Sequence, residues 1–349
     1  MRLCETVLRV TERIIYRSEV TRNNYEKKVN SARSLGVKRS HLSCGNQAHA
    51  YASMGTDKSS LTKEKTPNIG IVSAYNDMLS AHQPFKDYPN FIKEVARQSN
   101  ASAQVAGGVP AMCDGVTQGQ IGMELSLFSR DVIALSSSIA LSHNVFDGHI
   151  FLGVCDKIVP GLVMSALSFG HIPAIFIPAG PMTSGLGNEK KSVVRQRFAS
   201  GEINREELME AEMDSYHSPG TCTFYGTANT NQMLMEFMGL QLPGSSFVNP
   251  GTPLRDALTV EATKQIIFAS KDENNVCAVS EILDARAFVN GIVGLNATGG
   301  STNLLIHLIA MAKTAGLIIN WEDFADLSEV TPLMARIYPN GLADVNHFH

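Results

Sequence analysis

The sequence is poor in cysteine and tryptophan and has no long apolar run. Six cysteines are spread over 349 residues, which is too sparse for the disulfide framework of a small secreted domain. Charged residues interrupt the first twenty positions, and no later segment is long and apolar enough to span a membrane. We therefore expect a cytoplasmic protein without membrane contact, whose cysteines are free thiols or metal ligands.

Nucleotide-binding motifs are also missing. No Gly-Lys dipeptide occurs, which excludes a Walker A phosphate loop, and no strand is followed by Gly-x-Gly-x-x-Gly. Residues 1–66 are basic, with 13 Lys and Arg against 6 Asp and Glu, whereas the remainder is acidic. These charges come without a nucleic-acid-binding motif, so we expect no nucleic-acid partner. Leu8, Ile14 and Ile15 instead indicate a helical arm that packs on the acidic body or on a second subunit.

From residue 68 onward, short apolar runs alternate with helical segments. We predict strands at residues 68–74, 104–106, 150–155 and 174–177. We predict helices at residues 85–98, 119–141, 161–169, 228–238, 259–269 and 302–315. The helix at 119–141 should be mostly buried, and residues 190–216 should form a charged, exposed excursion. The predicted fold class is α/β, with a mostly parallel sheet flanked by helices in residues 67–349 and a helical basic N-terminal arm over residues 1–66.

A cysteine, an aspartate and a lysine follow one of these strands at Cys155, Asp156 and Lys157. Side chains just beyond the carboxyl end of a strand lie where open α/β sheets bind their ligands. A soft thiolate beside a hard carboxylate indicates a site for more than one kind of metal. The alternative is an inert buried cysteine followed by a solvated turn.

Three glycine-rich loops lead into predicted helices and carry further polar groups. Residues 107–119 contain Cys113 and Asp114, residues 220–230 contain Cys222, and residues 298–303 read Thr-Gly-Gly-Ser-Thr-Asn. The positive end of a helix should lower the pKa of the Cys222 thiol and favour the thiolate that binds iron. A helix start at residues 298–303 would suit an anion. In each loop the alternative is an ordinary helix cap.

Together these motifs resemble the iron-sulfur dehydratase family that acts on dihydroxy acids and sugar acids. The resemblance rests on residues 113–119, 155–161, 180–182, 222–230, 242–244 and 299–303 and covers nearly the whole chain. Longer strings at residues 73–84, 105–114 and 221–231 are similar to the branch of the family that uses 6-phosphogluconate. The resemblance implies a hydro-lyase of gluconate metabolism that converts 6-phospho-D-gluconate to 2-dehydro-3-deoxy-6-phospho-D-gluconate in the Entner-Doudoroff pathway.

The resemblance also implies cofactors and their ligands. Cys155 and Cys222 match cysteines that hold the family's cluster, in which an iron acts as a Lewis acid on the departing C3 hydroxyl. Asp114, Asp156 and Lys157 match the ligands of a divalent ion, Mg²⁺ or Mn²⁺, with the lysine carrying a carbamate. Of these, Asp156 and Lys157 are expected to be catalytic.

Two departures from the family pattern refine these expectations. Members with a 2Fe-2S cluster have a cysteine where this chain has Ala81, so a 4Fe-4S cluster is expected. Its third cysteine is either Cys113 or Cys44. Family members also continue beyond the position of His349 into a second domain with a serine base and another acidic ligand, so we expect this chain to be inactive alone.

Some expectations rest on position or charge alone. His82 lies just past the first predicted strand and is the histidine best placed for a catalytic role. Four cations are candidates for binding the substrate phosphate: Lys190, Lys191, Arg195 and Arg197.

Alternative functions stay open at this point. One is a dehydratase of unphosphorylated aldonic acids or of branched-chain dihydroxy acids. Another, of a different class, is a metal-free α/β binding module in which the cysteines only pack. The family resemblance further implies a small phosphorylated sugar acid as the partner and a homodimer as the assembly.

Overall fold

The computed structural model describes residues 4–36, 38–62, 66–271 and 277–348. Its core is a four-stranded sheet of β1 (Asn68–Ser73), β2 (Ser102–Gly108), β3 (Gly148–Leu152) and β4 (Ala174–Phe176). The strands pair in the order β2-β1-β3-β4, and every pair is parallel. β1 and β3 are buried along their whole length, as expected of central strands covered on both faces. The predicted α/β fold class is confirmed.

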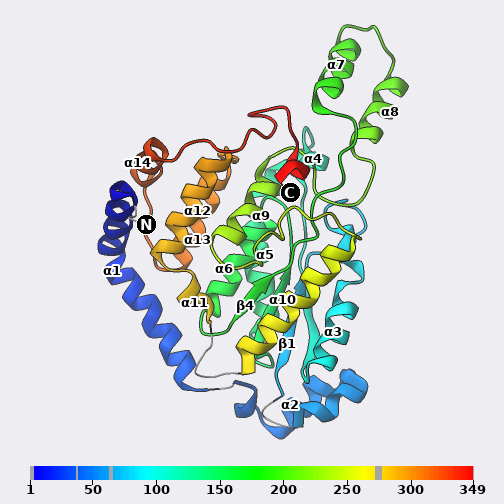
Figure 1. The fold of residues 1–349 in the computed structure, drawn as a ribbon. Coiled ribbons are helices and arrows are strands. Elements are labelled where there is room, and N and C mark those ends of the chain that lie inside the picture. The colour runs from blue at the N-terminus through cyan, green and yellow to red at the C-terminus, as the bar shows by residue number, and fades with distance from the viewer. Residues whose placement is uncertain (1–3, 37, 63–65, 272–276, 349) are drawn as a thin grey trace.

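Helices cover the two faces of this sheet. α3 (Tyr88–Gln98) packs with α10 (Pro253–Lys271) on one face, and α5 (Ser126–Leu141) packs with α6 (Ile158–Ser168) on the other. Right-handed crossovers place the connecting helices on opposite faces when the chain moves in opposite directions along the sheet. The chain moves one way from β1 to β2 and the other way from β2 to β3 and β4. Parallel strands share the edge at which they end, and this edge lies near α4 (Asp114–Thr117) in the upper part of Figure 1.

A second layer of helices lies outside α6. It contains α9 (Thr227–Phe237), α12 (Ala285–Thr298), α13 (Leu304–Thr314) and α14 (Trp321–Val330), with α1 (Glu5–Ser34) along its outer edge (Figure 1). Arg13 and Arg17 of α1 pair with Asp323 of α14, whose side chain is fully buried. The basic arm is therefore helical and packs on the acidic body of its own chain.

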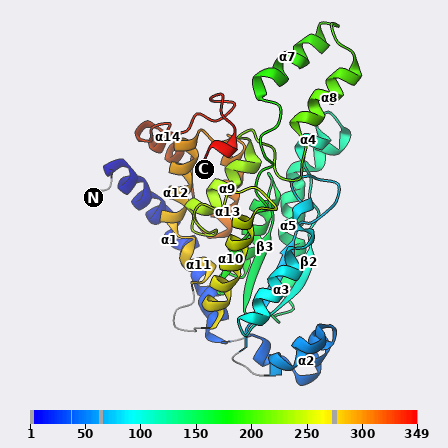
Figure 2. The same cartoon turned by 45° about the vertical axis from the view of Figure 1, so that its right-hand side comes forward.

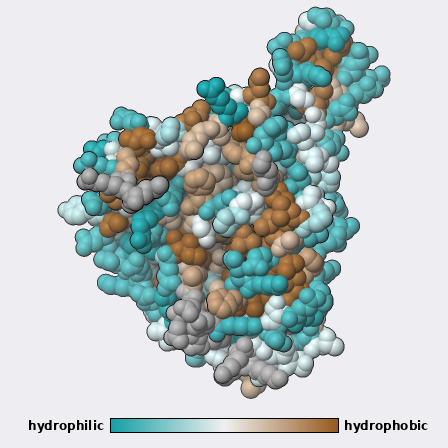
Figure 3. Space-filling view, viewed as in Figure 1, coloured by the Kyte–Doolittle hydropathy of each residue, from teal (hydrophilic) through white to brown (hydrophobic). Residues whose placement is uncertain are grey.

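The remaining elements are short or project from the body. The short ones are η1 (Lys38–His41), α2 (Cys44–Tyr51), η2 (Ala52–Thr62), η3 (Gln83–Lys86), α11 (Val279–Ile282) and η5 (Val345–Phe348). α7 (Asn188–Ala199) and α8 (Arg205–Ser215) form a hairpin that stands clear of the body in Figures 1 and 2, with a mostly hydrophilic surface in Figure 3. This hairpin is the predicted exposed excursion. Within the described residues, no helix is long and apolar enough to cross a membrane.

The segment 119–141 departs most from its prediction, because it is not one buried helix. A 3₁₀ turn, η4 (Ile121–Leu125), comes first, and α5 begins only at Ser126. Apolar side chains recur along both with alternating spacings of four and three residues, and all except the partly buried Val132 are exposed: Ile121, Leu125, Phe128, Val132, Leu135 and Ile139. We call this set the α5 stripe. The opposite face packs on α6, so the apolar periodicity marked a helix with two apolar faces and predicted burial correctly for only one.

Candidate functional site

The candidate site begins where β3 ends. Gly153 and Val154 extend the buried strand, and Cys155 then adopts a left-handed backbone conformation with a φ of 75°, which is uncommon for a residue with a Cβ. Asn231 of α9 holds this turn by donating its side-chain amide to the carbonyl oxygens of Cys155 at 3.2 Å and Asp156 at 3.0 Å. Strained backbone of this kind gathers at functional sites, where the surrounding structure over-determines it.

Three cysteine sulfurs meet at this turn. The sulfur of Cys113, just before α4, accepts hydrogen bonds from the Cys155 thiol and from the N–H groups of Gly115 and Val116. The hydrogen bond from Cys155, helped by those N–H groups and opposed by burial, lowers the pKa of Cys113 to about 6. The same hydrogen bond, together with burial, raises the pKa of Cys155. Cys222 lies within electrostatic reach of both sulfurs, so the two predicted cluster ligands come together with Cys113.

The prediction of a lowered thiol pKa at Cys222 is wrong. α9 begins only at Thr227, so its positive end is too far along the chain to act on this sulfur. Burial instead raises the pKa of Cys222 to about 11, and the charge of Cys113 adds to the shift. Cys113 is therefore the sulfur that favours the thiolate form.

The other candidate for the third cluster ligand lies elsewhere. Cys44 starts α2 and is exposed, and Figure 1 places α2 at the end of the molecule opposite α4. Cys4 and Cys277 are exposed as well. Of the two candidates, only Cys113 shares a hydrogen bond with Cys155.

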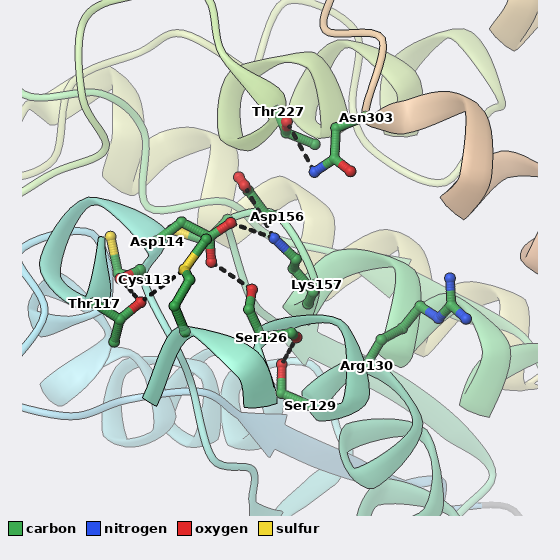
Figure 4. Close-up of polar contacts among 12 residues, drawn as sticks. Cys113, Asp114, Thr117, Ser126, Ser129, Arg130, Asp156, Lys157, Thr227 and Asn303 are labelled. Atoms are coloured by element: carbon green, nitrogen blue, oxygen red, sulfur yellow. Dashed lines mark hydrogen bonds and ion pairs between the residues drawn. The ribbon is translucent and has the colours of Figure 1, made fainter. Parts of the chain in front are cut away.

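A cluster of one lysine and two carboxylates lies beside the sulfurs (Figure 4). Lys157 is 4% exposed, and its ammonium pairs with Asp114 and, at 3.5 Å, with Asp156. The Ser126 hydroxyl donates to the second oxygen of Asp114 at 2.5 Å. Burial opposes the ionisation of Asp114, but hydrogen bonds from Lys157 and Ser126 outweigh it and lower its pKa. Burial raises the pKa of Asp156 to about 6, with Lys157 opposing the shift and the charge of Asp114 adding to it.

The two donor sets fit two kinds of metal centre. Among the described residues, no three His, Cys, Asp or Glu side chains are arranged to close around one metal ion. A four-iron cluster is larger than one ion and takes one cysteine for each ligated iron, so three cysteines from separate loops suit it. The ammonium of Lys157 lies between two carboxylates, and this is the kind of oxygen-lined position that a hard divalent cation takes.

Sequence reasoning missed a polar group next to Lys157. Arg130 of α5 donates to Nδ1 of His307 on α13 at 3.2 Å, and His307 lies within electrostatic reach of Lys157. Polar residues at the starts of α9 and α13 complete the group: Thr227, Ser301 and Asn303. A usable signal was the spacing of Arg130, which lies one helical turn after Ser126 and so shares its face of α5.

His82 stays outside these polar contacts. It is fully buried, and neither ring nitrogen has a hydrogen-bond partner within the described residues. Burial lowers the pKa of His82 to about 4, so its ring is neutral at pH 7. Its segment adjoins the Cys222 loop, because the N–H of Gly220 donates to the carbonyl oxygen of Ser80 at 2.8 Å. The catalytic role of His82 stays a prediction.

Three of the four cations considered for the substrate phosphate pair within the α7–α8 hairpin. Glu212 binds Arg195 at 2.5 Å and Lys191 at 3.3 Å, and Arg197 pairs with Glu202 at 3.6 Å. The hairpin thus neutralises much of its own positive charge.

The fold and its polar groups define the class of the protein: an open parallel α/β domain with sulfur, carboxylate and lysine side chains beyond the ends of its strands. A comparison with known families identifies the family. Residues 66–349 match the family described as dihydroxy-acid/6-phosphogluconate dehydratase, N-terminal, and the chain belongs to this family. The resemblance seen in its motifs is confirmed.

Curated relatives match along almost the whole chain. The phosphogluconate dehydratase of Rhizobium meliloti (strain 1021) is 61% identical over 97% of this chain and 56% of the relative. That of Escherichia coli (strain K12) is 60% identical over 98% of this chain and 57% of the relative. A dihydroxy-acid dehydratase of Endomicrobium trichonymphae is 34% identical over 88% of this chain and 56% of the relative. The chain spans a little over half the length of these relatives.

Proposed function

We propose that this chain is part of a phosphogluconate dehydratase, a cytoplasmic hydro-lyase that converts 6-phospho-D-gluconate to 2-dehydro-3-deoxy-6-phospho-D-gluconate in the Entner-Doudoroff pathway. The observation that carries the proposal is the meeting of three cysteine sulfurs beside Asp114, Asp156 and Lys157. The substrate follows from identities of 61% and 60% to proteins of that name, against 34% to a dihydroxy-acid dehydratase.

Cys113, Cys155 and Cys222 are the proposed ligands of a 4Fe-4S cluster. Three cysteines leave one of four irons without a protein thiolate, which is the iron that a substrate oxygen needs. When bound, the cluster supplies a Lewis acid for the departing C3 hydroxyl. Ala81 supports this choice, because members with a 2Fe-2S cluster have a cysteine at that position.

Asp114, Asp156 and Lys157 are the proposed ligands of Mg²⁺ or Mn²⁺. The ammonium of Lys157 offsets the two carboxylates in the metal-free protein. Addition of CO₂ to the neutral amine forms a carbamate and releases a proton, so that three anionic groups would repel one another unless a divalent cation joined them. Carbamate formation and metal binding would therefore be coupled, and Asp156 and Lys157 would hold the ion, which would supply a binding point for the substrate oxygens.

We infer a homodimer that buries the α5 stripe. The family resemblance implies the assembly, and an exposed apolar stripe with alternating spacings of three and four residues is the kind of helix surface that a second helix packs against. Leu135→Asp should convert the dimer to a monomer in sedimentation experiments. A dimer that survives this substitution would exclude the stripe as the interface.

Turnover tests the proposed substrate. Iron-sulfur reconstitution under anaerobic conditions should give a brown protein whose visible absorbance bleaches with dithionite. A full-length version that includes the family's second domain should then dehydrate 6-phosphogluconate faster than gluconate or dihydroxyisovalerate. A preference for either unphosphorylated acid would overturn the substrate. A folded but colourless product would instead favour the metal-free binding module.

A further inference from the structure

Arg130 is a cation without a matching carboxylate. Its side chain is 15% exposed, and within the described residues its partners are Asp131, its neighbour in sequence, at 3.5 Å and Nδ1 of His307 at 3.2 Å. Some other arginines of the chain are paired more closely: Arg39, for example, binds Asp147 at 2.8 Å. The planar guanidinium is suited to two parallel hydrogen bonds with a carboxylate or phosphate, and Arg130 makes no such pair.

The packing of α5 on α6 fixes Arg130 beside the candidate site. Gly161 lies one turn after Lys157 on α6, and a Cβ at Gly161 would come within 2.7 Å of the Arg130 carbonyl oxygen and 2.8 Å of Ile133. The two helices therefore touch through their backbones at Arg130. Ser126, one turn before Arg130, holds Asp114. Figure 4 shows Arg130 to the right of Lys157, with its guanidinium directed away from Asp114 and Asp156.

His307 fixes the direction of the Arg130 side chain. It is fully buried on α13, one turn after Asn303. A guanidinium only donates hydrogen bonds, so Nδ1 of His307 must accept and the ring proton lies on Nε2. The neutral ring orients Arg130 without cancelling its charge, and the cation stays available to an anion.

We propose that Arg130 binds an anionic oxygen group of the substrate, a carboxylate or a phosphate, and that His307 is its positioning residue. The inference rests on the proposed function, because a phosphorylated sugar acid carries one anion at each end. An ion held by Asp114, Asp156 and Lys157 would fix one part of this substrate. A second cation is needed to fix the direction in which the carbon chain of the substrate lies. The cations of the α7–α8 hairpin are less suited, since three of the four pair with the hairpin's own carboxylates.

Binding to the reconstituted protein, measured by calorimetry with 6-phosphogluconate, gluconate and inorganic phosphate, tests this inference. Arg130→Gln should weaken 6-phosphogluconate binding at least tenfold. Arg130→Lys keeps the positive charge but not the planar pair of N–H donors, and should weaken this binding less. If Arg130 binds the phosphate group, Arg130→Gln should also weaken the binding of inorganic phosphate but not that of gluconate. If Arg130 binds the carboxylate, the substitution should weaken the binding of gluconate but not that of inorganic phosphate. Unchanged binding of all three ligands would overturn the inference.

Controls separate this inference from folding and from the proposed function. Arg97→Gln on α3 removes an exposed arginine elsewhere and should leave all three affinities unchanged. His307→Gln keeps a hydrogen-bond acceptor and should retain more affinity than His307→Leu, with the visible spectrum unaltered in both; equal affinities would remove His307 from the inference. A full-length wild-type version that binds 6-phosphogluconate through Arg130 but does not dehydrate it would contradict the proposed function without contradicting the inferred anion site.

Discussion

Two clusters of aspartates and basic side chains in this protein differ in their charge balance. Between α1 and α14, the buried Asp323 accepts hydrogen bonds from Arg13, Arg17 and the N–H of Asn320. Burial opposes its ionisation, but these hydrogen bonds outweigh it and lower the pKa of Asp323. In this cluster the arginines balance the charge of the carboxylate, and the ion pairs hold α1 against α14.

The cluster beside the cysteines is short of positive charge. Within the described residues, one cation, Lys157, pairs with both Asp114 and Asp156, and the pKa of Asp156 is raised rather than lowered. Complete pairing holds two elements together, whereas incomplete pairing leaves a place for an additional cation. This difference separates a structural cluster from a candidate site more clearly than burial does.

The largest effect should come from removing a sulfur next to the charge-deficient cluster. Cys155→Ser replaces one of the three thiols, so the reconstituted protein should lose nearly all of its visible absorbance, and a full-length version should lose its dehydratase activity. Cys44→Ser, at the opposite end of the molecule, is the matched control and should keep both. Equal loss in the two variants would contradict the assignment of the site.

The next effect contrasts the two clusters in stability. Asp323→Asn removes the buried carboxylate of Arg17, while Arg13 keeps Asp326 at 2.9 Å, and should reduce the free energy of unfolding by about 2–4 kcal/mol. Asp114→Asn should cost under about 1 kcal/mol, because its neighbour Asp156 keeps Lys157 paired. Urea unfolding of the metal-free variants measures both. The comparison between the clusters fails if Asp114→Asn is the more destabilising change.

The pH dependence of stability should differ in sign between Asp156 and Asp323. Because the pKa of Asp156 is raised from 3.8 to about 6, its contribution to stability is complete below 3.8 and is lost as pH rises through 6. Ionised Asp156 should therefore oppose folding of the metal-free protein by about 2–3 kcal/mol at pH 7. The pKa of Asp323 is lowered, so its contribution is instead lost as pH falls below 3.8.

Asp156→Asn isolates the first of these pH effects. Unfolding measured between pH 4 and pH 7 should show wild type losing stability relative to the variant as pH rises. A constant difference in the free energy of unfolding across this range would mean that folding does not raise the pKa of Asp156. Asp323→Asn should show no such change between pH 5 and pH 7.

The smallest effect is expected at an exposed ion pair of the same arm. Arg33 and Glu281 pair at 2.7 Å, but each is more than 40% exposed. Glu281→Gln should change the free energy of unfolding by less than about 0.5 kcal/mol, because water screens the pair. A loss comparable to that of Asp323→Asn would contradict the view that buried, complete pairing fixes the arm.

Local sequence predicted the sheet well and the second helical layer only in part: the helices predicted at residues 228–238 and 302–315 are α9 and α13, whereas α12 and α14 were not predicted. The strand predicted at residues 68–74 is β1 at Asn68–Ser73. A short run rich in Ile and Val, in a sequence where strands and helices alternate, favours a buried strand. α12 was missed, since Gly291 and Gly294 weaken its helical signal. Both glycines are there for packing: a Cβ at either would come within 2.6 Å of side chains on α9. Such close helix contacts depend on partners distant in sequence.

The candidate site was predictable where it follows one strand and not where it joins several helices. Cys155, Asp156 and Lys157 stand together in the sequence, so the end of β3 gives their position directly. Arg130 and His307 are 177 residues apart, and their contact depends on the docking of α5 and α13 around α6. No local pattern carries that information.

Iron and sulfide content after anaerobic reconstitution shows whether the three cysteines hold one cluster. We expect about four irons and four sulfides per chain in the wild type and loss of most of both in Cys113→Ser. About two irons per chain, or a Cys113→Ser protein with a full complement, would contradict the claim that Cys113, Cys155 and Cys222 hold one four-iron cluster.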